Sequence, residues 1–336
     1  MEIAWLADVA SPNGVYRGVG PVGALRDRGH GVHQLRPGRL AAQVSLLDDV
    51  DVVLVHRFAD EETLDFVRTA RLRGVPVVFD DDDDASAIPR NNPGFQRVRG
   101  LEWDRRMRAL RQIVQLADCV TAPSPTLAER FREMGAADVA VTENCVVDEF
   151  CTWRQRPHEG VVVGWIAGKE HHVDLEQLPI GKVLERVLTD DPRARVVTVG
   201  LRLGFVHDRY EHLRKVPFNR LIEFASGFDI GIAPLVDTPF NRARSNVKLK
   251  EYGAAGVPWL ASDVGPYRGL GEREGGRLVA SDDWHAALTR LISRQRERRK
   301  LSKRAVRWAR GETLSVNAQR WEAVFTRVVG AGGLRG

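Results

Sequence analysis

Apolar residues occur along this chain in short runs that alternate with longer stretches of helical spacing. The short runs are bounded by glycine, proline or acidic residues, as buried strands are. They predict strands within residues 2–10, 51–58, 74–80, 161–167 and 194–200. Apolar positions three and four residues apart over 101–118 predict a long amphipathic helix. Strand, glycine-containing turn and helix follow one another near residue 1 and again near residue 161.

The most informative stretch spans residues 228–269, FDIGIAPLVDTPFNRARSNVKLKEYGAAGVPWLASDVGPYRG. An apolar run at 228–235 predicts a buried strand that leaves a sheet. Residues 246–256 have helical spacing, and Gly256 stands where a helix ends. A second short strand is predicted at 257–262. The stretch therefore predicts a strand, loop, helix and strand in succession.

Polar residues gather at the start of the predicted helix. Ser245 and Asn246 are favourable N-cap residues, so the helix is expected to begin there. Its first turn carries Lys248, beside backbone N–H groups that favour an anion. Glu251 follows one turn later and suits a pair of vicinal hydroxyls. A cation for phosphate and a carboxylate for ribose on one helical face predict a nucleotide-diphosphate site.

This stretch resembles the donor-binding core of GT-B glycosyltransferases, particularly the family 4 (group 1) branch. The most similar sub-branch has the pattern PL-x-D-x-x-FN-x-x-K/R-S-x-x-K-x-x-EY-x-A-x-G-x-P, which this sequence matches at nearly every position. In that family the glutamate that corresponds to Glu251 holds the nucleotide ribose. The better-known version has a second glutamate eight positions earlier, but Ala243 stands there in this chain.

The resemblance implies an α/β protein of GT-B fold, with two Rossmann-like α/β/α domains that face a central cleft. Residues 1–153 are expected to form the acceptor-side domain and residues 154–310 the donor domain. The polar segment 154–160 is the expected linker. Residues 311–336 are expected to form a helix that crosses back to the first domain, as in related enzymes.

The resemblance also assigns donor-side residues in the second domain. Gly168 and His171 match the family pattern IGW-x-G followed by H-x-x-DL, and Lys169 lies where the diphosphate is expected. The full expected donor-binding set is Gly168, Lys169, His171, Arg202, Val216, Pro217, Ser245, Asn246, Lys248 and Glu251. Val216 and Pro217 are expected at the nucleobase, and the cations at the phosphates. The expected catalytic residues are Lys248, Lys169 and Asp82.

Acceptor-side candidates lie in the first half of the chain. Glycines 14, 18 and 20 follow the first predicted strand and would let backbone approach a ligand closely. Arg17 in that loop is a candidate for a phosphate or an acceptor, with an ordinary surface arginine as the alternative. His56 and Arg57 end another strand, where ligands of open α/β sheets bind, although a structural histidine is the commoner outcome.

Five consecutive aspartates, Asp80 to Asp84, invite a metal interpretation because Mg²⁺ prefers carboxylates. GT-B enzymes usually need no such metal, and similar family members carry FD-x-DDD followed by IP-x-x-NP. The run is therefore interpreted as an acceptor-side loop in which Asp82 or Asp83 binds hydroxyls. Neither a metal ion nor another cofactor is expected, beyond a UDP- or GDP-sugar as donor substrate.

Charge is distributed unevenly along the chain. Residues 1–150 carry 18 Arg and no Lys against 24 Asp and Glu, whereas residues 290–310 hold ten basic residues and one acid, Glu297. That basic helix could meet nucleic acid or an anionic surface, or be an ordinary solvated face. The chain has no apolar run of the roughly 20 residues that a bilayer requires. Three cysteines without metal-ligand spacing and an N-terminus unlike a signal peptide predict a cytoplasmic protein.

These observations predict a glycosyltransferase that moves a sugar from a nucleotide-diphosphate sugar to an acceptor, with retention and without a metal. A glycan, a small molecule, a lipid-linked intermediate, a protein side chain and a modified DNA base all remain open as acceptors. The alternatives are a catalytically inactive nucleotide-sugar binder, which Ala243 motivates, and a nucleotide-sugar epimerase or phosphorylase on the same architecture.

Overall fold

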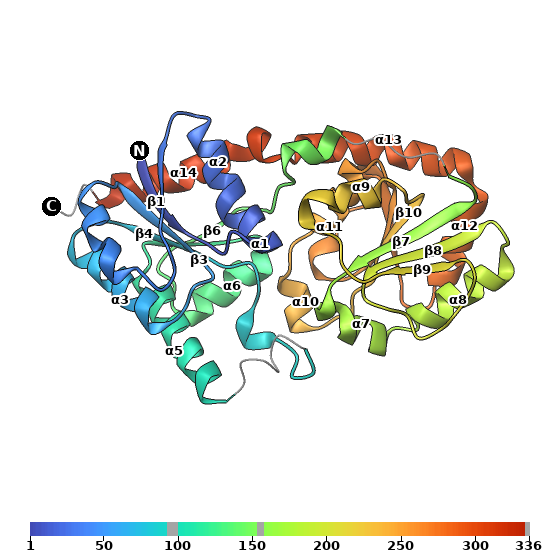
Figure 1. Cartoon of the computed structure of the whole chain (residues 1–336), viewed down its shortest axis with the longest axis horizontal. Helices are drawn as coiled ribbons and strands as arrows, with labels where there is room; N and C mark the ends of the chain where they lie inside the picture. Colours follow the sequence, from blue (N-terminus) through green and yellow to red (C-terminus); the bar gives the residue numbers. More distant parts are fainter. Residues whose placement is uncertain (93–99, 153–157, 333–336) are drawn as a thin grey trace.

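The computed structural model describes residues 1–92, 100–152 and 158–332. Over these residues the chain forms two α/β units, each built on a six-stranded sheet with helices on both faces (Figure 1). Every pairing within the two sheets is parallel. The predicted fold class, two Rossmann-like domains, is confirmed.

The first sheet has the strand order β2-β1-β3-β4-β5-β6. The chain places β2 on one side of β1 and then adds β3 to β6 on the other side. The strands β1 and β3 therefore border the topological switch point, where ligands of such sheets bind. The strands are β1 (Glu2–Leu6), β2 (Gly31–Gln34), β3 (Val52–His56), β4 (Val77–Asp80), β5 (Cys119–Ala122) and β6 (Val139–Val141). The helices are α1 (Pro12–Gly14), the π-helical turn η1 (Val15–Val19), α2 (Gly20–Arg26), α3 (Glu61–Leu72), α5 (Leu101–Leu116) and α6 (Pro125–Met134).

The second sheet has the order β12-β11-β10-β7-β8-β9, which places its switch point between β7 and β10. The strands are β7 (Val161–Ala167), β8 (Ala194–Gly200), β9 (Tyr210–Leu213), β10 (Ile230–Ala233), β11 (Trp259–Ser262) and β12 (Gly276–Val279). The helices are α7 (His172–Gln177), α8 (Ile180–Asp190), α9 (Leu221–Ala225), α10 (Pro239–Ala243), α11 (Val247–Ala254), α12 (Trp284–Ser293), α13 (Gln295–Gly311) and α14 (Leu314–Gly332).

Most predicted elements lie where the hydrophobic pattern placed them. Helix α11 has Asn246 as its N-cap, and Gly256 ends the segment with φ of 77°. Strands β3, β4 and β7 are buried along their whole length because helices cover both faces of a parallel sheet. The glycine-rich segment after β1 was predicted as a loop, but it is helical from Pro12 onward.

The C-terminal helix α14 packs against the first sheet, as predicted. Figure 1 shows α13 running along the second domain and α14 lying against the first. Trp321, Phe325 and Val328 of α14 share one buried apolar cluster with residues of β1, β3 and β4. Arg28 and His30, which follow α2, both pair with Glu322 of α14.

The chain crosses between the domains twice, and the two crossings are joined. Val146, after β6, forms a parallel bridge with Thr313, just before α14. Beside this bridge the fully buried Lys250 of α11 binds Glu143 at 2.9 Å and Glu312 at 2.7 Å. Its ammonium also donates to the Asn144 carbonyl at 2.9 Å. The helix that carries Glu251 is thereby tied to both crossings.

The glycines after β1 serve packing within the protein, which corrects the prediction that they line a ligand site. A Cβ on Gly14 would lie 1.7 Å from the Asp8 carbonyl oxygen, and one on Gly18 would lie 2.5 Å from the Ala7 Cβ. A Cβ on Gly20 would lie 2.5 Å from a methyl group of Leu314 in α14. These positions let the first helical segment pack closely on β1 and on the C-terminal helix.

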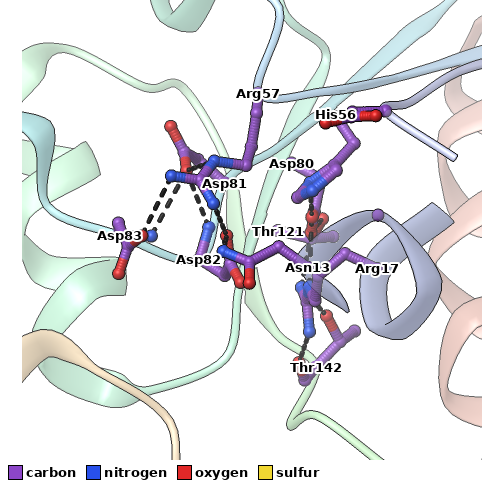
Figure 2. A network of polar contacts seen from close by, with 12 residues as sticks. Asn13, Arg17, His56, Arg57, Asp80, Asp81, Asp82, Asp83, Thr121 and Thr142 are labelled. Atoms are coloured by element: carbon purple, nitrogen blue, oxygen red, sulfur yellow. Dashed lines mark hydrogen bonds and ion pairs between the residues drawn. The ribbon is translucent and has the colours of Figure 1, made fainter. Parts of the chain in front are cut away.

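Arg17 is also a structural residue, contrary to the acceptor-side prediction. Its side chain is 0% exposed, and its guanidinium makes a bidentate pair with the equally buried Asp80 (Figure 2). It donates as well to the Thr142 carbonyl and hydroxyl, and it lies 4.8 Å from the ring centre of Trp321 in α14. The sequence alternative, an ordinary surface arginine, is equally wrong.

His56 and Arg57 likewise serve the interior of the first domain. His56 is 0% exposed and donates from Nδ1 to Asp80 at 2.8 Å. Arg57 has φ of 64° and points toward Asp81, Asp82 and Asp83, with N–O distances of 3.5, 3.3 and 2.9 Å (Figure 2). Burial lowers the pKa of Arg57, but the three carboxylates raise it by more. Arg57 is therefore charged, and its charge holds the aspartate loop.

The expected linker, residues 154–160, falls mostly outside the described residues, because 153–157 are not among them. The domain boundary at residues 153 and 154 therefore stays a prediction. None of the described helices is both long and apolar enough to cross a bilayer.

The Arg17–Asp80 pair yields a stability prediction. Burial raises the pKa of Asp80, but Arg17 and His56 together lower it to about 2. This is below the value of about 4 in an unfolded chain. Its contribution to folding is therefore complete above pH about 4 and is lost as pH falls through about 2. Arg17→Met should cost about 3–5 kcal/mol at pH 7, because Asp80 stays buried without its cation.

The measurement is urea unfolding of both proteins at pH 7 and pH 4. The difference should be smaller at pH 4, where Asp80 of the variant can take up a proton. Arg68→Met, which removes an exposed pair with Asp65, serves as the control and should cost less than about 1 kcal/mol. A cost for Arg17→Met no larger than the control would contradict a structural role.

Candidate active site between the two domains

A cavity of about 1750 Å³ lies between the two domains. Its walls come from segments that follow the carboxyl ends of β1, β4 and β6 in the first domain and of β7, β8 and β9 in the second. The loop after β10, helix α11 and Tyr267 complete the second wall. Both switch points therefore open onto one shared space, as the fold requires of a ligand site.

The two walls differ in charge. The second domain contributes six cationic side chains to the described lining: Lys169, Arg202, Arg214, Lys215, Arg244 and Lys248. It also contributes two carboxylates, Glu170 and Glu251. The charged residues that line the first domain's described wall are Asp82 and Asp83. A polyanionic ligand is therefore favoured on the second-domain side, and a hydroxylated or cationic one on the first.

The structure brings the predicted donor residues together. All of them except Asn246 line the cavity: Gly168, Lys169, His171, Arg202, Val216, Pro217, Ser245, Lys248 and Glu251. Asn246 instead occupies the N-cap position of α11 without a side-chain capping hydrogen bond, and its side-chain oxygen is buried without a hydrogen-bond partner. The first turn of α11 faces the cavity through Val247 and Lys248, so its free N–H groups add to the positive wall.

Glu251 is buried in this wall, with 3% of its surface exposed. Its Oε2 accepts from the Lys248 ammonium at 2.6 Å, and its Oε1 accepts from the Tyr16 hydroxyl at 2.5 Å. Tyr16 belongs to the first domain, so this hydrogen bond crosses between the domains. Burial, and then the Glu251 charge, raise the pKa of Tyr16 well above its ordinary value.

His171 is held by Asp174, which joins two separate motifs of the sequence. The His171 Nδ1 donates to Asp174 Oδ2 at 2.8 Å, which leaves Nε2 directed toward the Arg244 guanidinium at 3.4 Å. The other oxygen of Asp174 accepts from the Asn241 amide at 2.8 Å and from the Val236 N–H at 2.8 Å. One buried carboxylate therefore positions the histidine and the loop that leads into α10.

Arg244 lines the cavity and is influenced by carboxylates of both domains, Glu170 and Asp83. Its guanidinium is 3.7 Å from Glu170. Burial lowers the pKa of Arg244, but Glu170 and Asp83 raise it by more. Arg244 is the K/R position of the sequence pattern, so a signal existed for it. Glu170 had no such signal in the sequence. Burial raises the pKa of Glu170, but the charges of His171 and Arg244 lower it by more.

Ala243, where related sequences have a glutamate, is fully buried and packs in the apolar core of the first domain. Its carbonyl accepts from the Ser124 hydroxyl of the first domain at 2.6 Å. The next contact along the chain also crosses between domains, since the Asn144 amide donates to the Ser245 hydroxyl at 3.2 Å. The position of the missing carboxylate is thus an interdomain contact.

The aspartate run is divided between the core and the cavity. Asp80 is bound to Arg17, Asp84 caps a short turn and binds Arg130, and only Asp82 and Asp83 line the cavity. Asp82 accepts from the Asn13 amide at 3.3 Å. Burial raises the pKa of Asp81 to about 6, against the opposing charge of Arg57. Among the described residues, no group of three or more His, Cys, Asp or Glu side chains could hold a metal ion.

The basic segment 290–310 forms part of α12 and all but the end of α13. Arg298 is buried and donates to the carbonyls of Leu291 and Ile292, while Arg290 pairs with Glu297 and Arg304 with Glu272. The other basic residues of the segment are exposed: Arg294, Arg296, Arg299, Lys300, Lys303, Arg307 and Arg310. None of them is among the cavity-lining residues.

Sequence reasoning missed Tyr16, Lys250 and Glu170. Tyr16 stands between glycines whose helical packing was not predicted, so nothing marked its direction. Lys250 adjoins Glu251 in the motif, yet only its buried contacts with Glu143 and Glu312 distinguish it from an ordinary helix-surface lysine.

Comparison with known families identifies the first domain. Residues 7–145 match the model of the glycosyl transferase 4-like domain. A search of curated proteins found no match.

Solved structures resemble the whole chain. Sucrose-phosphate synthase from Thermosynechococcus elongatus is 13% identical, with a TM-score of 0.68 over 98% of this chain and 100% of that one. An alpha-glucosyltransferase in complex with UDP and a 13-mer DNA containing a HMU base is 12% identical, with a TM-score of 0.70 over 97% and 99%. Anabaena HepE in complex with UDP-glucose is 16% identical, with a TM-score of 0.66 over 97% and 100%.

Identities this low show the fold, and the domain match is a similarity of the first half of the chain. Together they confirm the resemblance to GT-B glycosyltransferases that the motif in residues 228–269 indicated. The chain has the GT-B fold, and its residues 7–145 match the glycosyl transferase 4-like domain.

Proposed function

We propose that this protein transfers a sugar from a UDP-sugar to a hydroxylated acceptor in the cavity between its domains. One observation carries the proposal. The cavity sets the cationic wall and the α11 N-terminus of the second domain, with Glu251 among them, opposite the two aspartates of the first domain. UDP is preferred over GDP because the similar glycosyltransferase structures contain UDP or UDP-glucose.

In this proposal the second domain holds the donor. Glu251 receives the ribose hydroxyls, and Val216 and Pro217 lie against the base. The diphosphate lies at the first turn of α11, near Ser245, Lys248 and Lys169. Arg202 and Arg244 supply further positive charge, and Gly168 allows the β7 turn to approach the phosphates closely.

The proposed reaction requires stabilisation of the negative charge that develops on the leaving group. When the bond between the anomeric carbon and the β-phosphate oxygen breaks, negative charge grows on the departing UDP. In this proposal, Lys248, Lys169 and the N–H groups at the start of α11 stabilise that charge. The acceptor oxygen forms the new bond to the anomeric carbon. Its proton passes to the leaving phosphate, as the resemblance to family 4 implies, so a dedicated protein base is not required.

The acceptor is proposed to be a neutral hydroxyl compound. On the described first-domain wall, the charged groups are the carboxylates of Asp82 and Asp83, which accept hydrogen bonds from hydroxyls and repel phosphate. Asp83 is the better candidate contact because 22% of its side chain is exposed, against 8% for Asp82. A sugar phosphate is disfavoured on this wall.

Several finer features of the proposal rest on the family resemblance. They are retention of anomeric configuration and independence from a metal ion. The proposed cytoplasmic location rests instead on the three cysteines and the N-terminal sequence. The basic helix α13 remains a candidate contact with nucleic acid or an anionic surface, and its six exposed cations support binding that weakens as salt rises.

Glu251→Ala should weaken UDP binding by about 1–3 kcal/mol, because the ribose hydroxyls lose a charged acceptor. The measurement is a thermal-shift panel of nucleotides and nucleotide sugars, followed by calorimetry with the best ligand. Glu185→Ala, on the exposed face of α8, is the control and should bind like the wild type. Unchanged UDP affinity in a folded Glu251→Ala protein would refute the assignment of this helix.

Lys248→Ala should lower kcat by about tenfold or more while changing donor KM less, because its cation acts mainly on charge that develops as UDP leaves. Release of UDP is measured with donor alone and with acceptor present. Lys182→Ala, exposed on α8, is the control. Tight donor binding without any turnover in the wild type would instead favour the non-catalytic alternative, and a new nucleotide sugar formed from donor alone would favour an epimerase.

A transfer assay tests the acceptor class. Neutral sugars and polyols should accept sugar from the donor, whereas the corresponding sugar phosphates should be poor acceptors. Activity should persist in EDTA, and proton NMR of the product should show the donor's anomeric configuration. Asp83→Asn should raise acceptor KM with little change in donor KM, while exposed Asp49→Asn should change neither. A preference for phosphorylated acceptors would overturn this part of the proposal.

A further inference from the structure

The hydroxyl of Tyr16 is the one contact that the first domain makes with the Glu251 carboxylate among the described residues. Tyr16 lies in the π-helical turn η1 after β1, and 3% of its surface is exposed. The donor-to-acceptor distance of 2.5 Å is that of a charge-assisted hydrogen bond. A first-domain residue therefore completes the environment of a second-domain carboxylate.

The two partners of Glu251 differ in how easily they can leave it. Lys248 has 21% of its side chain exposed and faces the cavity, where the proposed diphosphate would attract its ammonium. Tyr16 also lines the cavity, but only 3% of its surface is exposed. Its ring packs edge to face on Phe218 at 5.3 Å, and Phe218 packs on Phe150 at 5.3 Å, so it is held more firmly than the lysine side chain. A diphosphate would thus draw Lys248 away and leave Tyr16 in place.

A buried carboxylate without a donor is costly, so the residue that stays matters. An ionised carboxylate offers about four acceptor positions, of which Tyr16 occupies one. Two ribose hydroxyls can fill others without displacing it. Because burial and the neighbouring charge raise its pKa, the Tyr16 hydroxyl keeps its proton and remains a donor.

We propose that Tyr16 is a positioning residue for nucleotide recognition: from the first domain, its hydroxyl holds the Glu251 carboxylate in the orientation that receives the two ribose hydroxyls. This inference rests on the proposed function. It also means that the ribose site is complete only when Tyr16 of the first domain contacts Glu251 of the second. Recognition of the nucleotide therefore depends on this arrangement of the two domains.

The test compares two nucleotides that differ only in the ribose hydroxyls, UDP and 2′,3′-dideoxy-UDP, by calorimetry. Tyr16→Phe keeps the ring and its packing but removes the donor. It should weaken UDP binding by about tenfold or more and dideoxy-UDP binding by less than about twofold. Tyr210→Phe is the matched control: it removes hydroxyl contacts with Thr198 and the Leu203 N–H, outside the cavity lining, and should alter neither affinity.

Each other outcome has a distinct meaning. Equal losses for both nucleotides would show a general packing role and overturn the inference. Tighter UDP binding by Tyr16→Phe would show that the hydroxyl competes with ribose, which also overturns it. A wild-type protein that prefers UDP, loses this preference in Glu251→Ala and keeps it in Tyr16→Phe would refute the role of Tyr16 alone. A wild type that does not distinguish the two nucleotides would refute the proposed ribose site itself.

Discussion

The buried charge of Lys250 is the constraint on which the site geometry depends. Its side chain has no exposure, and its ammonium binds Glu143, Glu312 and the Asn144 carbonyl, which lie where the chain passes between domains. Because a buried unpaired lysine is costly, helix α11 cannot shift without disturbing both crossings. The neighbouring residues of α11 therefore face the cavity from a fixed position, and the segments that join the two domains are both bound to this helix.

Some residues of α11 fix the helix to the second sheet, and others face the ligand cavity. Tyr252 accepts from the Ile166 N–H at 3.2 Å and donates to the Ile232 carbonyl at 2.9 Å, which fixes α11 against β7 and β10. Lys248 and Glu251 of the same helix line the cavity. The apolar and ion-pair contacts thus support a short polar surface that carries the proposed donor chemistry. A similar division exists around Asp174, which orients His171 and the segment before α10 at once.

In the first domain, charge is used mainly for support. Asp80 accepts from Arg17, His56 and Thr121 within a fully buried network, and Arg57 holds the following aspartates at the edge of the cavity. Of that acidic run, only Asp82 and Asp83 line the ligand space. In the proposed function, the resulting asymmetry, with cations on one wall and carboxylates on the other, orients a nucleotide sugar with its phosphates toward the second domain.

The sequence alone determined the elements and the donor motif, because both are local. Strand and helix periodicities, the cap at Asn246 and Gly256, and the spacing from Arg244 to Glu251 depend on residues close together in the chain. Tertiary structure decided what each polar side chain meets. Arg17 directly follows the cavity-lining Tyr16, and His56 ends a strand. Both side chains nevertheless turn into the core, because Asp80 offers a buried carboxylate that only folding brings to them. Tyr16 reaches Glu251 across 235 residues of chain, and no local pattern encodes a hydrogen bond between separate domains.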